Sequence, residues 1–492
     1  MLNKINLDKL LLTLLTISCL LILSIFFIRF ENSISFTYLT HVLTSGYEEE
    51  SLLEIWYNIK GESMYVDHLA YPYRWTIYNW LFYDFYSIIF KVLNVAYGFE
   101  FDWLPTVLRL LTLTSSCLLL FIIIKINKNL NNKSKLNFLL STSLIFGLSF
   151  GYWNITVRPD IISILFEILA LFLFLKNKRN PNYLNLLIVG FILFIAWSFK
   201  QTALIVFCSI NIYLFLNLKI KKNILLVLTW IFLVFLATLV QQNDNFISTL
   251  YFLDTKYPFD LFILFYNSAK LLTKNLVLFS AIIIILYLKL IKTNLYLKKS
   301  KKYVSSDNCL LFIGLFISLI YYLAVHSNAG VSDNHTFILI IFLNFLFIKN
   351  EGEILENLNF KKIIIFSIIS NIIICIFVIS GKLGRLSPNI YSNIEEYKQC
   401  IESTSRSKFI DKNYYRLPWI SSYSNPSVET FNYRYELENN NLKNGGHEGL
   451  IENGFYEYLV LFNDNKYNLE KYSLNKLCKN FKIYKLISEN DR

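Results

Sequence analysis

The chain has 492 residues, of which 55% are hydrophobic and 17% charged, and its mean hydropathy is +0.44. A water-soluble domain cannot bury that much apolar surface, so the composition excludes a soluble protein and indicates many membrane spans. The formal net charge of +12 comes mostly from short loops between apolar runs, which favours a topological role over binding to nucleic acid.

Eleven apolar runs, each long enough to cross a bilayer core of about 30 Å, follow one another along the chain. The first, 8–29, comes after Lys4 and Lys9 and has no small-residue cleavage site behind it, so we interpret it as a retained anchor. The other ten are predicted over 105–125, 137–155, 160–176, 184–199, 201–218, 223–241, 275–292, 309–325, 335–349 and 361–380.

The charges of the loops predict which side of the membrane each loop faces. With the N-terminus in the cytoplasm, every inside loop is rich in lysine or arginine, as the positive-inside rule requires: 125–135, 176–182, 219–223, 289–302 and 349–362. The outside loops are poorer in positive charge and richer in acidic, aromatic and polar residues: 30–104, 153–160, 197–202, 242–274 and 326–335.

One further segment, 76–95, is apolar enough to span but would move every later basic loop to the outside. We therefore expect it to lie along the membrane interface, with its tryptophans and tyrosines at headgroup depth.

The spans end near residue 380, and a polar region follows that is long enough for a small α/β domain. We expect a transmembrane domain over 1–380, with 30–104 as its first outer loop, and an extracytoplasmic domain over 381–492. Apolar runs at 455–463 and 480–486 predict two strands in the second domain. Cys400 and Cys478 also lie there, and the sequence leaves open whether a disulfide joins them.

Charged and amide side chains gather on the predicted outer side. Two of them, Arg158 and Asp160, lie at the mouth of a span, where charge is costly unless it meets water, a partner or a ligand. The others are Glu48, Glu49, Glu50, Glu54, Asp67, His68, Arg74, Lys200, Gln201, His326, Asp333, Asn334 and His335.

Plainer interpretations exist for each of these features. The three successive glutamates are typical of a solvated surface, Arg158 and Lys200 of snorkelling anchors, and "SNAGVSDN" of a tight turn. The histidines lack the spacing of a HExxH metal site, so no metal-binding residues are predicted.

Four segments in order resemble the GT-C fold membrane glycosyltransferases. "YEEESLLEIWYNIKGESMYVDHLAYPYRWTIYNWLFY" is similar to their first outer loop, in which an acidic residue precedes a turn marked here by Gly61 and Tyr65. "VRPDIISILFEILALFLFL", "FIAWSFKQTALIVF" and "GVSDNHTFIL" look like their Arg/Lys-Pro-Asp segment, their Lys-Gln segment and their later glycine-to-asparagine turn. The tail also resembles that of bacterial members.

This resemblance implies an all-α polytopic fold and an inverting transfer of sugar from a polyprenyl-phosphate carrier to an acceptor outside the cytoplasm, in a bacterial inner membrane. A carboxylate, Glu48 or Glu49, is expected to take the proton of the acceptor hydroxyl. Spacing back from Gly61 favours these two over Glu50.

Cations near the headgroup plane are expected to stabilise the leaving lipid phosphate, and the candidates are Arg158, Lys200 and Arg74. A third group is expected to position the substrates: Tyr65, Asp67, His68, Asp160, Gln201, His326 and Asn334.

The partners implied are a polyprenyl-phosphate sugar, a glycan, lipid or protein acceptor, and membrane lipids, without nucleic acid. The use of a divalent cation stays open, because the superfamily has members with and without one. Three other functions are the alternatives: a transporter or flippase of lipid-linked sugars, a polysaccharide polymerase or ligase, and a non-catalytic scaffold. The absence of internal symmetry and the position of the charges at the outer ends of spans favour the transferase over the transporter.

Overall fold

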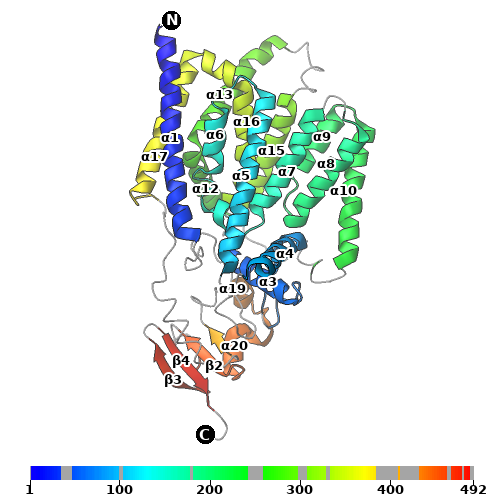
Figure 1. Ribbon diagram of the computed structural model, residues 1–492, viewed down its shortest axis with the longest axis vertical. Helices are drawn as coiled ribbons and strands as arrows, with labels where there is room; N and C mark the ends of the chain where they lie inside the picture. Colours follow the sequence, from blue (N-terminus) through cyan, green and yellow to red (C-terminus); the bar gives the residue numbers. More distant parts are fainter. Residues whose placement is uncertain are drawn as a thin grey trace.

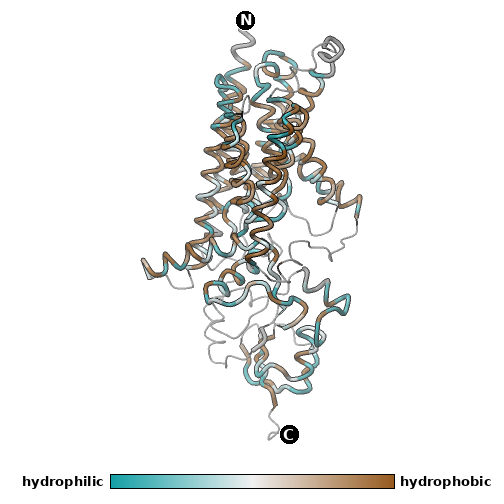
Figure 2. The backbone as a smooth tube through the Cα atoms, turned by 90° about the vertical axis from the view of Figure 1, so that its right-hand side faces the viewer, coloured by the Kyte–Doolittle hydropathy of each residue, from teal (hydrophilic) through white to brown (hydrophobic). Residues whose placement is uncertain are grey.

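The computed structural model describes residues 2–34, 47–71, 73–98, 103–177, 181–241, 246, 259–296, 307–327, 333–383, 408–410, 431–461, 467–478 and 481–487. A bundle of helices makes up most of the molecule, and a smaller part with a β-sheet lies beyond one end of it (Figure 1). The tube of Figure 2 is mostly hydrophobic along the bundle and more mixed in the sheet-containing part.

The bundle is built from α1 (Leu2–Ile34), α5 (Leu104–Leu130), α6 (Asn137–Ile145), α7 (Asp160–Asn177), α8 (Tyr183–Phe199), α9 (Ile205–Leu216), α10 (Ile220–Gln241), α12 (Leu261–Lys274), α13 (Leu276–Tyr296), α15 (Asp307–His326), α16 (Phe337–Glu356) and α17 (Leu358–Ile379). Within the described ranges, five helices are long and apolar enough to cross a membrane, or six if the bent pair α12–α13 is one span. The count of eleven spans therefore stays a prediction.

The core of the bundle is centred on α16, which other helices surround. Twelve consecutive residues, 337–348, are all buried, and a helix that is apolar on every side is typical of such an enclosed position. Two asparagines interrupt this core: Asn127 of α5 donates to the side-chain oxygen of Asn344 on α16 at 2.8 Å.

The expectation of one continuous helix over 137–155 is wrong. Helix α6 ends at Ile145, and the chain then turns into a short 3₁₀-helix, η2 (Gly151–Ile155). The turn is tight: a Cβ on Gly147 would overlap the carbonyl oxygen of Ser143, and Gly151 has a φ of +44°, which glycine adopts most easily. Two glycines four residues apart therefore allow the helix to stop halfway.

The outer connection expected over 242–274 contains a helix in its last part. Residues 261–274 form α12, whose axis makes an angle of 95° with α13. Asp260 caps α12 by accepting hydrogen bonds from the backbone N–H groups of Phe262 and Ile263. Phe262 and Phe265 of α12 are among the most exposed large apolar side chains of the described chain.

The first loop contains two helices at one end of the bundle, α3 (Tyr47–Lys60) and α4 (Trp80–Tyr97). Figure 1 places α4 across the end of the bundle rather than within it, as expected for an interfacial segment. Gly98, in the left-handed conformation with φ +65°, ends α4.

Hydrogen bonds sort the loops onto two ends of the bundle. At one end, Lys361 pairs with Asp8 at 2.5 Å, and Lys349 donates to the carbonyl of Leu130. At the other, Thr106 donates to the carbonyl of Ile34, and the first loop makes hydrogen bonds with the backbone of Val157 and Trp197. This grouping of the loops agrees with the pattern of basic residues, whereas the side of the membrane that each end faces stays a prediction.

Beyond α17, the described chain forms a four-stranded sheet in the order β1-β2-β4-β3. The strands are β1 (Lys408–Ile410), β2 (Tyr458–Leu461), β3 (Tyr472–Cys478) and β4 (Phe481–Leu486), with helices α19 (Phe431–Glu438) and α20 (Gly446–Glu452). Only the β1–β2 pair is parallel. The strands expected at 455–463 and 480–486 are confirmed as β2 and β4.

Close packing between α15 and α16 yields the first prediction. Gly314 of α15 faces the ring of Phe342, which a Cβ would overlap, whereas Gly352 of α16 has open space around it. Gly314→Ala should lower the free energy of unfolding by about 1–3 kcal/mol through overpacking. Gly352→Ala, the matched control, should raise it by about 0.5–1 kcal/mol, because alanine is the better helix former. Thermal unfolding in detergent measures both, and equal shifts in the two variants would contradict the packing.

Candidate functional site

Glu48 joins the first loop to the bundle through a buried ion pair. Its carboxylate accepts from Nε and Nη2 of Arg109 on α5, at 2.9 and 3.0 Å, and from the backbone N–H of Val157 at 2.9 Å. Glu48 is completely buried and Arg109 is 1% exposed. These contacts use three of the roughly four acceptor positions of a carboxylate.

A second pair of the same type lies on the same helix. Glu54 of α3 accepts from Nε and Nη2 of Arg74 at 3.0 and 2.7 Å, and the guanidinium also lies 3.6 Å from the ring centre of Tyr57. Arg74, one of the cations expected to bind the donor phosphate, is therefore held by Glu54 within the first loop. The pair instead fixes the chain after residue 72 against α3.

Four of the residues singled out from the sequence meet at Asp160. This carboxylate accepts from Nε of Arg158 at 3.1 Å, Nζ of Lys200 at 2.5 Å and Nδ2 of Asn334 at 2.7 Å. Asp160 is the first residue of α7, where the helix dipole favours a negative charge. We call these four residues the Asp160 cluster; all are at least nine-tenths buried.

The Asp160 cluster joins loops that are far apart in the sequence. Arg158 stacks against Trp153 of η2, with its Cζ 4.4 Å from the ring centre. Lys200 follows α8 in extended conformation, so the lysine leaves the helix just where it reaches the carboxylate. Asn334 belongs to η3 (Asp333–Thr336), the 3₁₀-turn between α15 and α16.

Gln201 holds the first loop close to the cluster. Its Nε2 donates to the carbonyl of Ile77 at 2.7 Å, and Asn79 donates to the carbonyl of Trp197 at 2.6 Å. These two amide contacts attach the chain around residue 78 to the end of α8. As a result Tyr78 lies near the guanidinium of Arg158, 5.7 Å from Cζ to the ring centre.

A polar cavity adjoins the Asp160 cluster. Its empty space, part of it open to the surroundings, is about 330 Å³, and Asp160, Lys200 and Asn334 form part of the lining. Glu167, two turns along α7, lies on the same cavity and accepts from the backbone N–H of Val206. His335 completes this wall, with Nδ1 2.6 Å from the hydroxyl of Tyr321. The cavity thus offers both cationic and hydroxyl groups to a polar ligand.

Three other predicted residues belong to the part of the first loop that leads to the sheet-containing part. Asp67 pairs with Lys443 at 2.7 Å, and this hydrogen bond lowers the pKa of the Asp67 carboxyl. His68 packs on Trp75, whereas Tyr65 donates to the carbonyl of Tyr78 at 3.0 Å. Asp67 and His68 therefore contact structural partners at this junction, away from the cluster.

His326 lies apart from the Asp160 cluster. It is 2% exposed, stacks on Tyr322, and its ring centre is 6.4 Å from that of His335. Neither ring nitrogen has a hydrogen-bond partner among the described residues. The neighbouring turn contains Asp333, which pairs with Lys270 and Lys274 of α12.

Sequence reasoning missed Arg109, Lys270 and Lys274. Arg109 was detectable as a lone charge within an apolar span, a pattern that often marks a functional or paired residue. The two lysines lay in a region expected to be a loop. The side chain of Glu49 lies outside the described residues, and within the described chain no cluster of three or more candidate ligands could hold a metal ion.

The sheet-containing part includes an oxidised cysteine. Cys478, the last residue of β3, is disulfide-bonded, whereas Cys400, the partner considered from the sequence, lies outside the described residues. Disulfides persist in oxidising compartments, so this bond bears on which side of the membrane the sheet-containing part occupies.

The Glu48–Arg109 pair yields the second prediction. Glu48→Gln leaves a buried guanidinium without its counter-charge and should cost about 3–5 kcal/mol of unfolding free energy. The double variant Glu48→Gln/Arg109→Gln should recover part of that loss. Glu62→Gln is the control: Glu62 is 44% exposed and 3.7 Å from Arg74, and exposed pairs contribute about 0–1 kcal/mol. Thermal unfolding distinguishes the variants, and a Glu48→Gln protein as stable as Glu62→Gln would refute the pairing.

No protein-family model and no curated protein sequence matches the chain. Among solved structures, an oligosaccharyltransferase from Archaeoglobus fulgidus, described as a complex with Zn and sulfate, has a similar fold. The TM-score is 0.53 at 11% sequence identity, and the alignment covers 91% of this chain and 67% of that one. At this identity the likeness shows the fold alone. The chain thus has a fold similar to that of this oligosaccharyltransferase, which supports the fold expected from the sequence and nothing finer.

Proposed function

We propose that the protein is an integral membrane glycosyltransferase that uses a polyprenyl-phosphate sugar and acts at the end of the bundle where the first loop lies. The observation that carries this proposal is the Asp160 cluster, a buried group of two cations and one carboxylate beside a polar cavity. Buried charge at the mouth of a span is costly and is typical of a functional site.

The cluster suits the phosphate of a lipid-linked donor. Arg158 and Lys200 contribute two positive charges and Asp160 one negative charge, so the cluster has a net charge of +1. A leaving lipid phosphate gains negative charge as the bond to the sugar breaks, and fixed cations in a buried site stabilise that charge strongly. In this proposal Asp160 positions the two cations.

The first-loop carboxylates Glu48 and Glu49 are our candidates for the general base of an inverting transfer. Such a group must lie within hydrogen-bond reach of the acceptor hydroxyl. Glu48 is connected to the cluster through one hydrogen bond: its carboxylate accepts from the backbone N–H of Val157, the residue before Arg158. Glu48 also anchors the first loop through Arg109, so a Glu48 variant loses stability as well as a candidate base. Substitution of Glu49 is therefore the more decisive test.

The disulfide of Cys478 supports an extracytoplasmic location for the region after residue 380, which we propose as a separate domain. This region contacts the first loop, so the proposed site would face the same compartment. A lipid, glycan or protein acceptor would reach the site from that side. The proposal needs no metal ion, although the related structure is described with Zn.

The third prediction concerns the donor phosphate. Arg158→Gln and Lys200→Gln should each lower turnover of a polyprenyl-phosphate sugar by about 10²–10³-fold, the usual cost of removing one group that stabilises transition-state charge. Lys91→Gln is the control, because Lys91 is exposed on α4 at the same end of the bundle. Single-turnover assays in nanodiscs measure the rates. Donor kinetics unchanged in both variants would remove the cluster from the phosphate site.

The fourth prediction concerns the base. Glu49→Gln or Glu48→Gln should lower the rate of transfer by about 10²–10⁴-fold, the usual contribution of a general base. Glu54→Gln is the matched control, since it breaks an equally buried carboxylate–arginine pair on the same helix. If Glu48→Gln and Glu54→Gln lose rate and thermal stability in parallel while Glu49→Gln is fully active, neither candidate is the base.

A further inference from the structure

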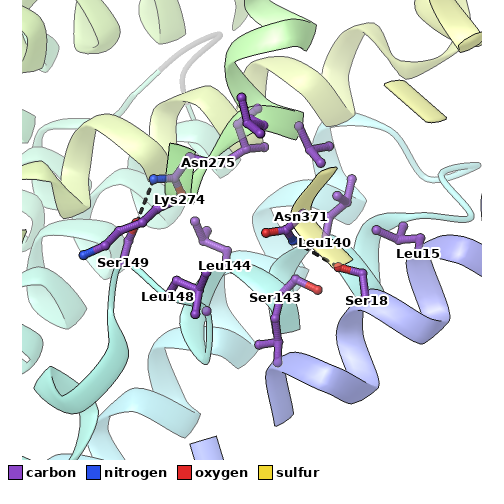
Figure 3. A pocket seen from close by; sticks show the side chains of 15 residues that line it. Leu15, Ser18, Leu140, Ser143, Leu144, Leu148, Ser149, Lys274, Asn275 and Asn371 are labelled. Atoms are coloured by element: carbon purple, nitrogen blue, oxygen red, sulfur yellow. Dashed lines mark hydrogen bonds between the residues drawn. The ribbon is translucent and has the colours of Figure 1, made fainter. Parts of the chain in front are cut away.

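A second cavity lies on the other side of η2 from the Asp160 cluster. It is enclosed by α1, α6, α17 and the sharp bend between α12 and α13, and Figure 3 shows its lining. About 550 Å³ of its space is free of protein atoms, part of it open to the surroundings. Nothing in the proposed transfer reaction uses this cavity.

One part of the cavity wall is polar and positively charged. Lys274 and Asn275 lie at the bend, and Asn275 donates to the hydroxyl of Ser149 at 2.7 Å, as Figure 3 shows. Nζ of Lys274 pairs with Asp333, which Lys270 also contacts at 3.2 Å. The hydroxyl of Ser149 can donate its own proton to a ligand.

Arg29 adds to the positive charge beside this wall. A Cβ on Gly151, two residues after Ser149, would lie 3.1 Å from its Nη1, its guanidinium packs 4.8 Å from the ring centre of Tyr152, and it is 8% exposed. Its Nε has no hydrogen-bond partner among the described residues. Together with Lys270 and Lys274 it gives three cations against the one carboxylate of Asp333, and Lys274 is the one of the three that lines the cavity. An excess of positive charge close to hydrocarbon favours an anionic ligand.

The rest of the cavity is apolar. Its wall consists mainly of aliphatic side chains from three helices: Leu15, Ile22, Leu140, Leu144, Val277 and Leu278. Two polar groups in this part are bonded to each other: Asn371 of α17 donates to the hydroxyl of Ser18 at 3.0 Å. A cavity with a lysine and a hydroxyl at one side and leucines at the other matches a molecule that has an anionic head and a hydrocarbon chain.

We propose that this cavity binds a phosphate-bearing lipid, with the phosphate at Lys274 and Ser149 and an acyl chain against the leucines of α1 and α6. This lipid is separate from the glycosyl donor, because the two cavities have no lining residue in common. Binding of the lipid does not rest on the proposed transferase activity.

The lipid site is connected to the Asp160 cluster by one turn of chain. Within η3, Asp333 pairs with Lys274 and the next residue, Asn334, donates to Asp160. A phosphate at Lys274 competes with Asp333 for the same ammonium group.

The test measures lipids retained by the purified full chain in native mass spectrometry. Dioleoylphosphatidylglycerol is compared with dioleoylphosphatidylcholine, which has the same chains and no net charge. We expect the wild type to retain one molecule of the anionic lipid preferentially. Lys274→Gln should weaken this binding about tenfold or more, as expected for the loss of a charge-assisted contact. Leu144→Trp, which fills the apolar part, should abolish it.

Two matched controls separate the cavity from general effects of charge and bulk. Lys382→Gln removes an exposed lysine just after α17, and Leu118→Trp enlarges a side chain of α5 that is 51% exposed. Both should bind like the wild type. Equal retention of the two lipids, or an equal loss in Lys382→Gln and Lys274→Gln, would overturn the proposal.

A second measurement distinguishes a lipid from free phosphate and guards against misfolding of the tryptophan variant. Inorganic phosphate is titrated while thermal unfolding is followed in wild type, Lys274→Gln and Leu144→Trp. The lipid proposal predicts at most a weak stabilisation, at millimolar phosphate, that Lys274→Gln removes. Saturation at micromolar phosphate, retained in a folded Leu144→Trp protein, would show a site for free phosphate instead.

Discussion

The site depends on burying the carboxylate of Asp160 at the start of α7. A buried charge is tolerated only when it is paired and hydrogen-bonded, and Asp160 satisfies this by drawing in Arg158, Lys200 and Asn334. These donors come from three connections between helices, so one electrostatic requirement fixes the relative positions of α7, α8 and η3. The same requirement places Lys200 on the wall of the adjoining cavity, with Arg158 bound to the other oxygen of the same carboxylate.

Two bidentate ion pairs fix the first loop, each between a carboxylate on α3 and an arginine. Glu48 connects the helix to the bundle through Arg109, and Glu54 connects it to the following chain through Arg74. Two-point pairing specifies orientation as well as distance. The outer part of the loop is fixed by the sheet-containing part: Tyr73 donates to the carbonyl of Lys443 at 2.5 Å and packs in a shared aromatic cluster.

The two cavities give the proposed functions a common geometry. The short 3₁₀-helix η2 presents Tyr152 to one group of cations and Trp153 to the other. It follows the early end of α6, which stops after nine residues. A transferase that handles lipid-linked substrates needs polar groups close to hydrocarbon, and the break in α6 creates two such places.

The sequence by itself determined the apolar helices, the grouping of loops onto two ends and the two strands of the tail, because hydrophobic periodicity and loop charge are local properties. It also marked Arg158, Asp160 and Lys200 as unusual, since charge at the mouth of a span is costly wherever it occurs. Only the tertiary structure decided which charges pair. Arg74 and Arg158 look alike in sequence, yet one is bound by Glu54 and the other by Asp160. The bend between α12 and α13 likewise appears only in the folded chain, because an apolar run continues through it without a periodic signal.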